Sequence, residues 1–258
     1  MKNYCLITGA SGGIGLEFAR VFAKNGYNLI LVARSNDKLK CLKKELETRY
    51  SIKAVAYSAD LTSCVEIEQL HKYVIESNLQ VDILVNNAGF GDLCAFLDSK
   101  WDRQQALIEL NITALVKLTY LFGSDMRKRG AGRIINLSSV AAFSAGPYMS
   151  LYYASKSFVL SFSEALAAEL DGTGISVTAL CPGPTSTGFE KNAHMGKSVM
   201  FSRFKTATAK DVAETGYRAA MRGKSIKYHG FVTNAFNIAT RLLPRRITRK
   251  MAAGMNKT

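Results

Sequence analysis

The stretch "YCLITGASGGIG", Tyr4 to Gly15, decides the fold of this chain. It begins as a short apolar run of the kind that forms a buried parallel strand, and it continues into a glycine-rich turn. Apolar residues then recur at helical spacing from Ile14 to Phe22. Glycines in such a turn let the backbone approach a pyrophosphate, whose charge is met by the amides and dipole at the N-terminus of the next helix. The stretch can be only a turn, but its place between strand and helix favours phosphate binding through Gly9, Ser11, Gly13, Ile14 and Gly15.

The same alternation of strand and helix continues along the chain. The patterns predict helices at about residues 36–50, 63–77, 101–129 and up to residue 170. The intervening apolar runs, which we interpret as strands, are "NLILVAR", "KAVAYSAD", "VDILVNN", "GRIINLSS" and "ISVTALCPG". This repetition predicts an α/β fold, a doubly wound parallel sheet with helices on both faces. Ligands bind such sheets at the carboxyl ends of the strands, so the informative polar residues should follow the strands.

Composition favours one domain over residues 1–258. The chain is 48% hydrophobic, has only four prolines, and contains no Pro/Ser-rich linker. Its start does not resemble a secretory signal, and no apolar run approaches the roughly 20 residues needed to span a bilayer, so we expect a cytoplasmic protein. The five cysteines are scattered, which indicates reduced thiols and no metal site.

The net charge of +14 is concentrated at the C-terminal end. No acidic residue follows Glu214, whereas ten arginines and lysines do. Residues 231–258 form a basic C-terminal extension with a possible apolar helical face, interrupted at Pro244: Phe231, Ala235, Phe236, Ala239, Leu242 and Leu243. Two readings remain open. Either the apolar face packs on the body or on another subunit and leaves the arginines in solvent, or the segment lies on an anionic membrane surface. Nucleic-acid binding is not indicated, because no recognition module is present.

A cation follows the second predicted strand, where an acid that binds an adenosine ribose 2′-hydroxyl is usual. Arg34 occupies this position and no acid appears before Asp37. A guanidinium suits a 2′-phosphate, although an arginine at a helix start can simply be solvated. We infer NADP(H) over NAD(H).

Two adjacent tyrosines precede a lysine in "YMSLYYASKSF", Tyr148 to Phe158. On a helix, residues four apart share a face, so Tyr152 lies one turn before Lys156. Tyr153, three residues before the lysine, is also near that face. Spacing therefore prefers Tyr152 for any chemistry with Lys156 without excluding its neighbour.

Taken together, the motifs resemble those of the short-chain dehydrogenase/reductase family over about residues 3–211. They occur in order: "TGASGGIG" from Thr8, "NNAG" from Asn86, "NIT" from Asn111, "SS" at 138–139, "YYASK" ending at Lys156, and "CPGPTST" from Cys181. The resemblance implies a single-domain Rossmann-type fold and hydride transfer between a nicotinamide and a carbonyl or secondary alcohol. It assigns the proton transfer to Tyr152, polarisation of the substrate oxygen to Ser139, and support of the proton relay to Lys156 and Asn111. Ser138 is the structural alternate to Ser139. We also expect the ammonium of Lys156 to lower the pKa of Tyr152.

The resemblance also implies the remaining cofactor contacts. Asp60, with Leu61, would meet the adenine, and Asn87, Ala88 and Gly89 would follow the adenosine side. Tyr152, Lys156, Pro182, Gly183 and Thr187 would meet the nicotinamide end, with Thr185 as a competing hydroxyl. Asn86 is expected to stabilise the central strands instead.

Residues 188–205 occupy the place of the family's substrate lid. Apolar residues there favour an apolar substrate, although such residues also commonly cover a core. Family members commonly form dimers or tetramers, so a homodimer or homotetramer is expected. Two rivals remain: a silent NADP(H)-binding sensor or scaffold, and an NAD-linked alcohol dehydrogenase.

Overall fold

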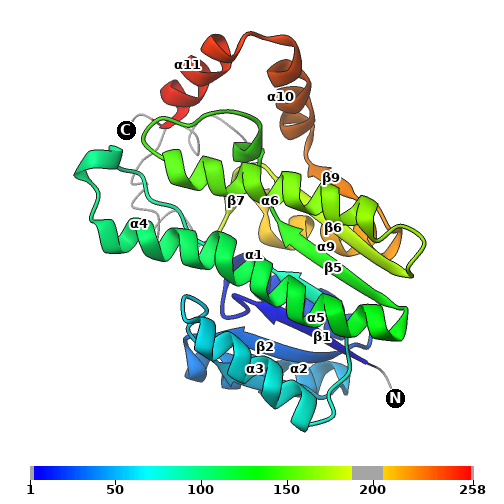
Figure 1. Ribbon diagram of the computed structural model, residues 1–258. Helices are drawn as coiled ribbons and strands as arrows, with labels where there is room; N and C mark the ends of the chain where they lie inside the picture. The colour runs from blue at the N-terminus through cyan, green and yellow to red at the C-terminus, as the bar shows by residue number, and fades with distance from the viewer. Residues whose placement is uncertain (1–2, 188–205, 257–258) are drawn as a thin grey trace.

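A parallel sheet forms the centre of the structure, a computed structural model that describes residues 3–187 and 206–256. Within those residues the sheet has seven strands in the order β3-β2-β1-β4-β5-β6-β9. The strands are β1 (Tyr4–Thr8), β2 (Asn28–Ala33), β3 (Ala54–Ser58), β4 (Val81–Asn86), β5 (Gly132–Leu137), β6 (Ile175–Pro182) and β9 (Ile226–His229). Every pairing is parallel. The predicted doubly wound α/β fold is therefore confirmed, and the strand order reverses between β1 and β4 (Figure 1).

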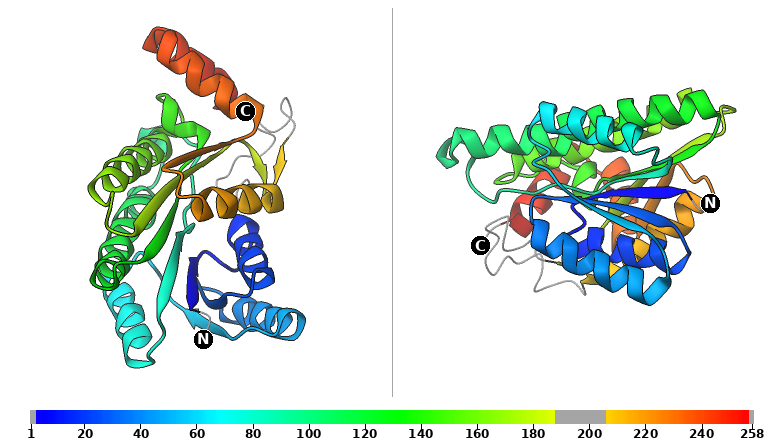
Figure 2. Two further views of the ribbon diagram at one scale, coloured as in Figure 1. Left: turned by 90° about the vertical axis from the view of Figure 1, so that its right-hand side faces the viewer. Right: turned by 90° about the horizontal axis from the view of Figure 1, so that it is seen from below.

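Helices cover both faces of the sheet (Figure 2). One layer contains α1 (Gly13–Lys24), α2 (Asn36–Tyr50) and α9 (Ala209–Met221), which bury Phe18, Leu39 and Val212 in one core. The other contains α3 (Cys64–Glu76), α4 (Trp101–Ile108), α5 (Leu115–Arg129) and α6 (Ser150–Glu169). Here Ile67 and Leu118 belong to a second core. Both faces are thus apolar, which explains the near-continuous hydrophobic runs of the central strands.

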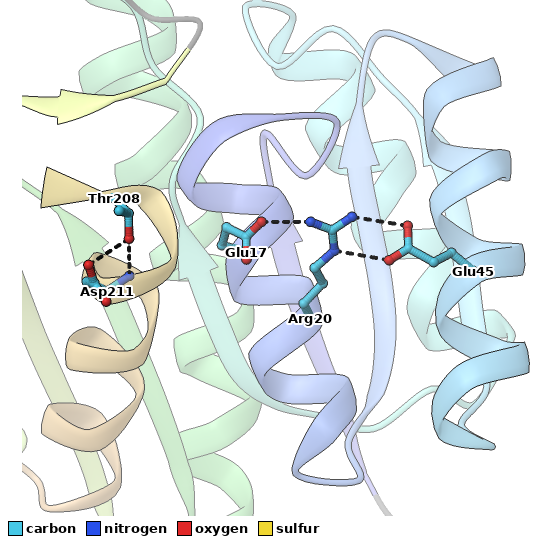
Figure 3. Close-up of polar contacts among 5 residues, drawn as sticks. All are labelled: Glu17, Arg20, Glu45, Thr208 and Asp211. Atoms are coloured by element: carbon cyan, nitrogen blue, oxygen red, sulfur yellow. Dashed lines mark hydrogen bonds and ion pairs between the residues drawn. The ribbon is translucent and has the colours of Figure 1, made fainter.

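Polar contacts fix the helices of the first layer (Figure 3). Arg20 of α1 holds Glu45 of α2 through two hydrogen bonds of 3.0 and 3.2 Å, and it also pairs with Glu17 at 2.8 Å. At the start of α9, the Thr208 hydroxyl accepts the Asp211 amide at 3.1 Å and donates to the Asp211 carboxylate at 2.7 Å. Such a cap satisfies an otherwise unpaired amide. These contacts stabilise α1, whose N-terminus carries the glycine turn.

The helix expected over residues 101–129 contains a π turn. Between α4 and α5 the backbone widens into η2 (Glu109–Ala114), and Asn111 lies in it. By length and composition, the whole run Trp101–Arg129 could cross a membrane, contrary to the sequence-based expectation that no segment could. It packs against β4, β5 and α6 and buries the polar side chains of Gln104, Asn111 and Thr119. We therefore interpret it as a core helix.

After α9 the chain adds one strand and two terminal helices. The sequence patterns did not indicate β9, because this strand is only four residues long and Lys227 and His229 alternate in it with Ile226 and Tyr228. The basic extension forms α10 (Phe231–Leu242) and α11 (Arg245–Asn256), separated at Pro244 as expected. Residues 185–186 (β7) and 207–208 (β8) pair as a short parallel ladder. The expected lid, 188–205, lies outside the described residues.

Candidate active site

The glycine turn after β1 has the geometry expected of a phosphate-binding turn. Gly9 and Gly13 have φ values of +65° and +55°, which side-chain-bearing residues rarely adopt. A Cβ atom on Gly15 would lie 2.3 Å from the carbonyl oxygen of Gly9. Gly12 caps α1 without a side-chain hydrogen bond, and the first turn of α1 contains no acid. The positive end of α1 therefore fits an anion.

A hydroxyl not singled out in the sequence connects this turn to the next strand. The Thr8 hydroxyl donates to the Val85 carbonyl and accepts the amides of Asn87 and Ala88, at 3.2, 2.9 and 3.0 Å. The Asn87 side chain donates in return to the Thr8 carbonyl at 2.9 Å. The contacts fix the ends of β1 and β4 against each other. The position of Thr8, just before the first glycine, was the only signal in the sequence.

Ser139, Tyr152 and Lys156 meet at the end of β5. Ser139 lies two residues after the end of β5 and forms a hydrogen bond with Tyr152. The Ser139 hydroxyl also accepts a hydrogen bond from the Ala141 amide at 3.1 Å. The Lys156 ammonium lies 5.8 Å from the centre of the Tyr152 ring and donates to the Leu137 carbonyl at 2.8 Å. The spacing prediction for Tyr152 and Lys156 thus agrees with their placement on neighbouring turns of α6.

Burial controls the protonation of both groups. It raises the pKa of Tyr152 to about 12, although the hydrogen bond with Ser139 favours the phenolate. It lowers the pKa of Lys156 to about 8. The expected lowering of the tyrosine pKa by Lys156 is not seen in this arrangement, because the loss of solvent outweighs the hydrogen bond with Ser139. Tyr152 is a neutral phenol, the form that donates a proton.

The neighbouring tyrosine has a different environment. The Tyr153 hydroxyl donates to Asn256 of α11 at 3.2 Å, and its ring packs with Ala141, Met149 and Ala252. The Asn256 amide in turn donates to the Pro147 carbonyl at 2.8 Å. Tyr153 therefore joins α6 to the C-terminal helix and does not face Lys156.

The other expected catalytic positions are close to this pair. Ser138 is buried and donates to the Lys156 carbonyl at 2.9 Å, so it supports the packing of α6. The Asn111 side chain binds both backbone groups of Phe90, at 3.1 and 2.9 Å, and the Ser155 hydroxyl at 3.1 Å. A Cβ atom on Gly89 would lie 2.9 Å from Asn111 Oδ1 and 3.6 Å from Lys156 Nζ, so both side chains face that glycine.

The structure also places the remaining predicted cofactor residues around the strand ends. Arg34 is exposed directly after β2, and Leu61 is buried after β3. The Asp60 carboxylate accepts the amide and hydroxyl of Thr62, at 3.0 and 2.9 Å. Pro182 ends β6, Gly183 follows, and the Thr185 hydroxyl donates to the Gly183 carbonyl at 2.9 Å.

Thr187 connects this second cluster to the glycine turn. A Cβ atom on Gly13 would lie 3.3 Å from the Thr187 Cβ, so the segment after β6 covers the start of α1. The turn, the adenosine-side residues and the nicotinamide-side residues thus share one edge of the sheet. Asn86 stabilises the strands as expected, since it donates to Asn136 of β5 and to Thr119 of α5, both at 2.9 Å.

A buried carboxylate organises the loop that follows Gly89. Asp92 accepts hydrogen bonds from Ser99 and Arg103, both at 2.6 Å, and from Gln104 at 3.0 Å. The Cys94 amide bonds to the Tyr148 carbonyl at 2.9 Å, which places this loop beside the start of α6. Sequence reasoning missed Asp92, since an acid in a loop gives no indication that it will be buried.

Comparison with known proteins identifies the family. The family model described as short chain dehydrogenase matches residues 3–198. The 3-oxoacyl-[acyl-carrier-protein] reductase of Synechocystis is 32% identical, over 76% of this chain and 79% of its own. The 17-beta-hydroxysteroid dehydrogenase type 3 of Mus musculus is 36% identical over 74% of this chain. That match spans 63% of the mouse enzyme, less than two thirds of its length.

A solved structure agrees with these relatives. The short-chain dehydrogenase from Sphingobium yanoikuyae in complex with NADPH superposes with a TM-score of 0.83 and 28% identity, over 94% of this chain and 97% of its own. The bulky-bulky ketone specific alcohol dehydrogenase from Comamonas testosteroni gives 0.78 and 27%, over 94% and 95%. The chain therefore belongs to the short-chain dehydrogenase/reductase family and is an enzyme of that family.

Proposed function

We propose that this protein is an NADP(H)-dependent carbonyl reductase that works reversibly on secondary alcohols. The observation that carries the proposal is the half-buried, neutral Tyr152 hydrogen-bonded to Ser139 and one helical turn from Lys156. When bound in this site, NADPH would supply the hydride that reduces the carbonyl carbon. The alkoxide oxygen that forms must then be stabilised and protonated.

The residues of this chain can perform both tasks. Ser139 donates to the substrate oxygen and stabilises the developing charge. Tyr152 donates its phenolic proton to the same oxygen. Lys156, whose ammonium is held between the Tyr152 ring and the Leu137 carbonyl, stabilises the phenolate that remains. Asn111 holds the Phe90 backbone, next to the glycine that Lys156 faces, and so fixes the position of this segment beside Lys156.

The cofactor cradle fits a phosphorylated dinucleotide. The glycine turn and the uncapped N-terminus of α1 suit the pyrophosphate. Arg34 is exposed at the end of β2, where its guanidinium can bind a 2′-phosphate. The NADPH bound by the Sphingobium relative supports the same assignment. Asp60, Leu61, Asn87, Ala88 and Gly89 line the adenosine side in this proposal, and Pro182, Gly183, Thr185 and Thr187 the nicotinamide side.

Cofactor choice tests the role of Arg34. We expect Arg34→Ser to lower kcat/KM for NADPH by roughly 10- to 100-fold, since a charge-assisted hydrogen bond contributes about 1.5–3 kcal/mol. The value for NADH should change less than about 3-fold. Arg49→Ser, at the other end of α2, is the matched control and should leave both unchanged. Equal losses with both cofactors would contradict 2′-phosphate recognition and favour an NAD-linked enzyme.

The substrate class is proposed as apolar ketones. The relatives named for acyl and steroid substrates support this choice. The experiment is NADPH oxidation with ketones of increasing chain length at fixed cofactor concentration. We expect kcat/KM to rise with apolar surface, by up to about fivefold for each buried methylene. A constant or falling value would contradict an apolar site.

A homodimer or homotetramer is proposed from an exposed apolar face. Tyr120 and Phe158 are 71% and 41% exposed and border a shallow groove of about 440 Å³ between α5 and α6, lined also by Ile112 and Val116. Sedimentation velocity measures the oligomeric state directly, and a monomer would contradict the proposed homodimer or homotetramer.

We place the enzyme in the cytoplasm, in part at a membrane surface.

A further inference from the structure

On both C-terminal helices, large apolar side chains are exposed while polar side chains are buried. On α10, Ile238 and Leu242 are 57% and 79% exposed, whereas the polar Thr233 and Asn237 are buried. On α11, Ile247 and Met251 are each 45% exposed, and the buried positions are Thr248, Ala252 and Asn256. Of the apolar residues named from the sequence, Leu242 and Leu243 are not covered by the body of this chain, which leaves another subunit or a membrane surface as their partner. A helix that directs large apolar side chains outward needs an apolar partner.

The exposed residues are grouped by helix geometry. Ile238 and Leu242 are four residues apart on α10, and Ile247 and Met251 are four apart on α11, so each pair forms one row. Figure 1 shows both helices at one end of the molecule, beyond β9, and the left-hand view in Figure 2 agrees. The buried Thr248, Ala252 and Asn256 repeat every four residues and form the face of α11 that packs toward the body.

The charges beside these rows have one sign. Exposed cations flank the apolar residues of both helices: Arg241, Arg245, Arg246, Arg249 and Lys250. No acid follows Glu214 in the sequence, so neither helix carries a partner for them. A second copy of this chain docked through the same face would bring like charges together. An anionic lipid surface satisfies both features, because the apolar rows enter the acyl boundary while the cations meet the headgroups.

We propose that α10 and α11 form a docking surface for an anionic lipid bilayer. The surface is next to the catalytic site, since Tyr152 and Met255 pack against the cluster that contains Ala252. Docking would thus hold the substrate site close to the bilayer. The docking does not depend on the proposed reductase activity.

Vesicle cosedimentation tests the proposal with the full chain. The probes are phosphatidylcholine vesicles with and without 30% phosphatidylglycerol at low salt. We expect binding to the anionic vesicles only, decreasing as salt is raised. The basic variant Arg245→Gln/Arg246→Gln/Arg249→Gln/Lys250→Gln should lose at least about 100-fold in partition coefficient. The apolar variant Ile238→Ser/Leu242→Ser should also lose at least about 10-fold.

A charge-matched variant on and just after α2 separates this surface from general electrostatics. It removes four exposed lysines, three on α2 and one between α2 and β3, Lys38→Gln/Lys40→Gln/Lys44→Gln/Lys53→Gln, and should keep most of the binding. Equal loss in both basic variants would overturn the proposal, as would an absence of anionic-vesicle binding. Circular dichroism and NADPH turnover check that each variant is folded. A change of oligomeric state in the apolar variant without vesicles would assign the face to a second copy and also overturn it.

Discussion

Replacing Tyr152 with phenylalanine is expected to lower kcat for ketone reduction by about 10³-fold, within the range contributed by a positioned general acid. The substitution removes only the hydroxyl, which forms a hydrogen bond with Ser139 in the structure. NADPH binding, followed by fluorescence titration, should weaken less than about 3-fold. Single-turnover kinetics would place the loss in the chemical step.

Tyr153→Phe is the matched control, because it makes the same change one residue away. Its hydroxyl donates to Asn256 and faces α11. We expect turnover within about 3-fold of the original, with a loss of unfolding free energy of about 1 kcal/mol for the lost hydrogen bond. Equal activity in both variants would contradict the catalytic role of Tyr152. No turnover in the original protein that still binds NADPH would favour the sensor or scaffold reading over the reductase.

The protonation state of Tyr152 affects the pH dependence of each direction of the reaction. Because burial raises the pKa of Tyr152 to about 12, the phenol stays neutral across physiological pH and is poised to donate. Alcohol oxidation needs the phenolate instead. For alcohol oxidation at neutral pH, a bound substrate oxygen or cofactor charge would therefore have to lower this pKa.

Sequence patterns predicted the parallel sheet well because its strands are buried on both faces. The runs in β1, β2, β4, β5 and β6 are predominantly apolar, and glycine or polar residues follow each one. By contrast β9 is short and carries Lys227 and His229. A strand of this kind forms through its pairing with β6, which is a long-range contact that no local pattern records.

Candidate site residues were predictable where local spacing determined their position. Tyr152 and Lys156 are one turn apart on a helix, and the glycines follow one strand. Thr8 was missed because its importance depends on a partner far along the chain, Val85, and Asp92 because a loop acid gives no sign that it will be buried. The pKa of Tyr152 could not be predicted either, since spacing identifies its neighbours but not its exclusion from solvent.

Lys156→Met should abolish most activity and yet stabilise the fold at neutral pH. We expect kcat to decrease at least about 10²-fold, because the remaining phenolate loses its cation. Burial lowers the lysine pKa from its usual 10.5 to about 8, so the folded state holds the charge at a cost. A shift of this size corresponds to a destabilisation of the folded state by about 3 kcal/mol. Methionine removes this cost but also removes the hydrogen bond to Leu137, which contributes about 1 kcal/mol to stability.

The pH dependence gives this prediction its sign. Below pH 8 both the folded and the unfolded chain hold the proton, and the full cost is present. Between pH 8 and 10.5 the unfolded chain binds more protons than the folded one, so the stability of the original protein rises with pH. Methionine does not titrate, and its advantage should shrink by about 2 kcal/mol between pH 6.5 and 9.5. The two pH values, 6.5 and 9.5, both lie below the pKa of about 12 of Tyr152 in the folded chain.

Urea unfolding at the two pH values measures this difference. Lys40→Met, at an exposed position of α2, is the control and should show no comparable change with pH. A Lys156→Met variant that is less stable at pH 6.5 and insensitive to pH would mean that the ammonium is well compensated in the folded state. If the expected gain is found, the enzyme retains a buried cation that its fold does not need, and the stabilisation of the Tyr152 phenolate is the reason that the structure offers for keeping it.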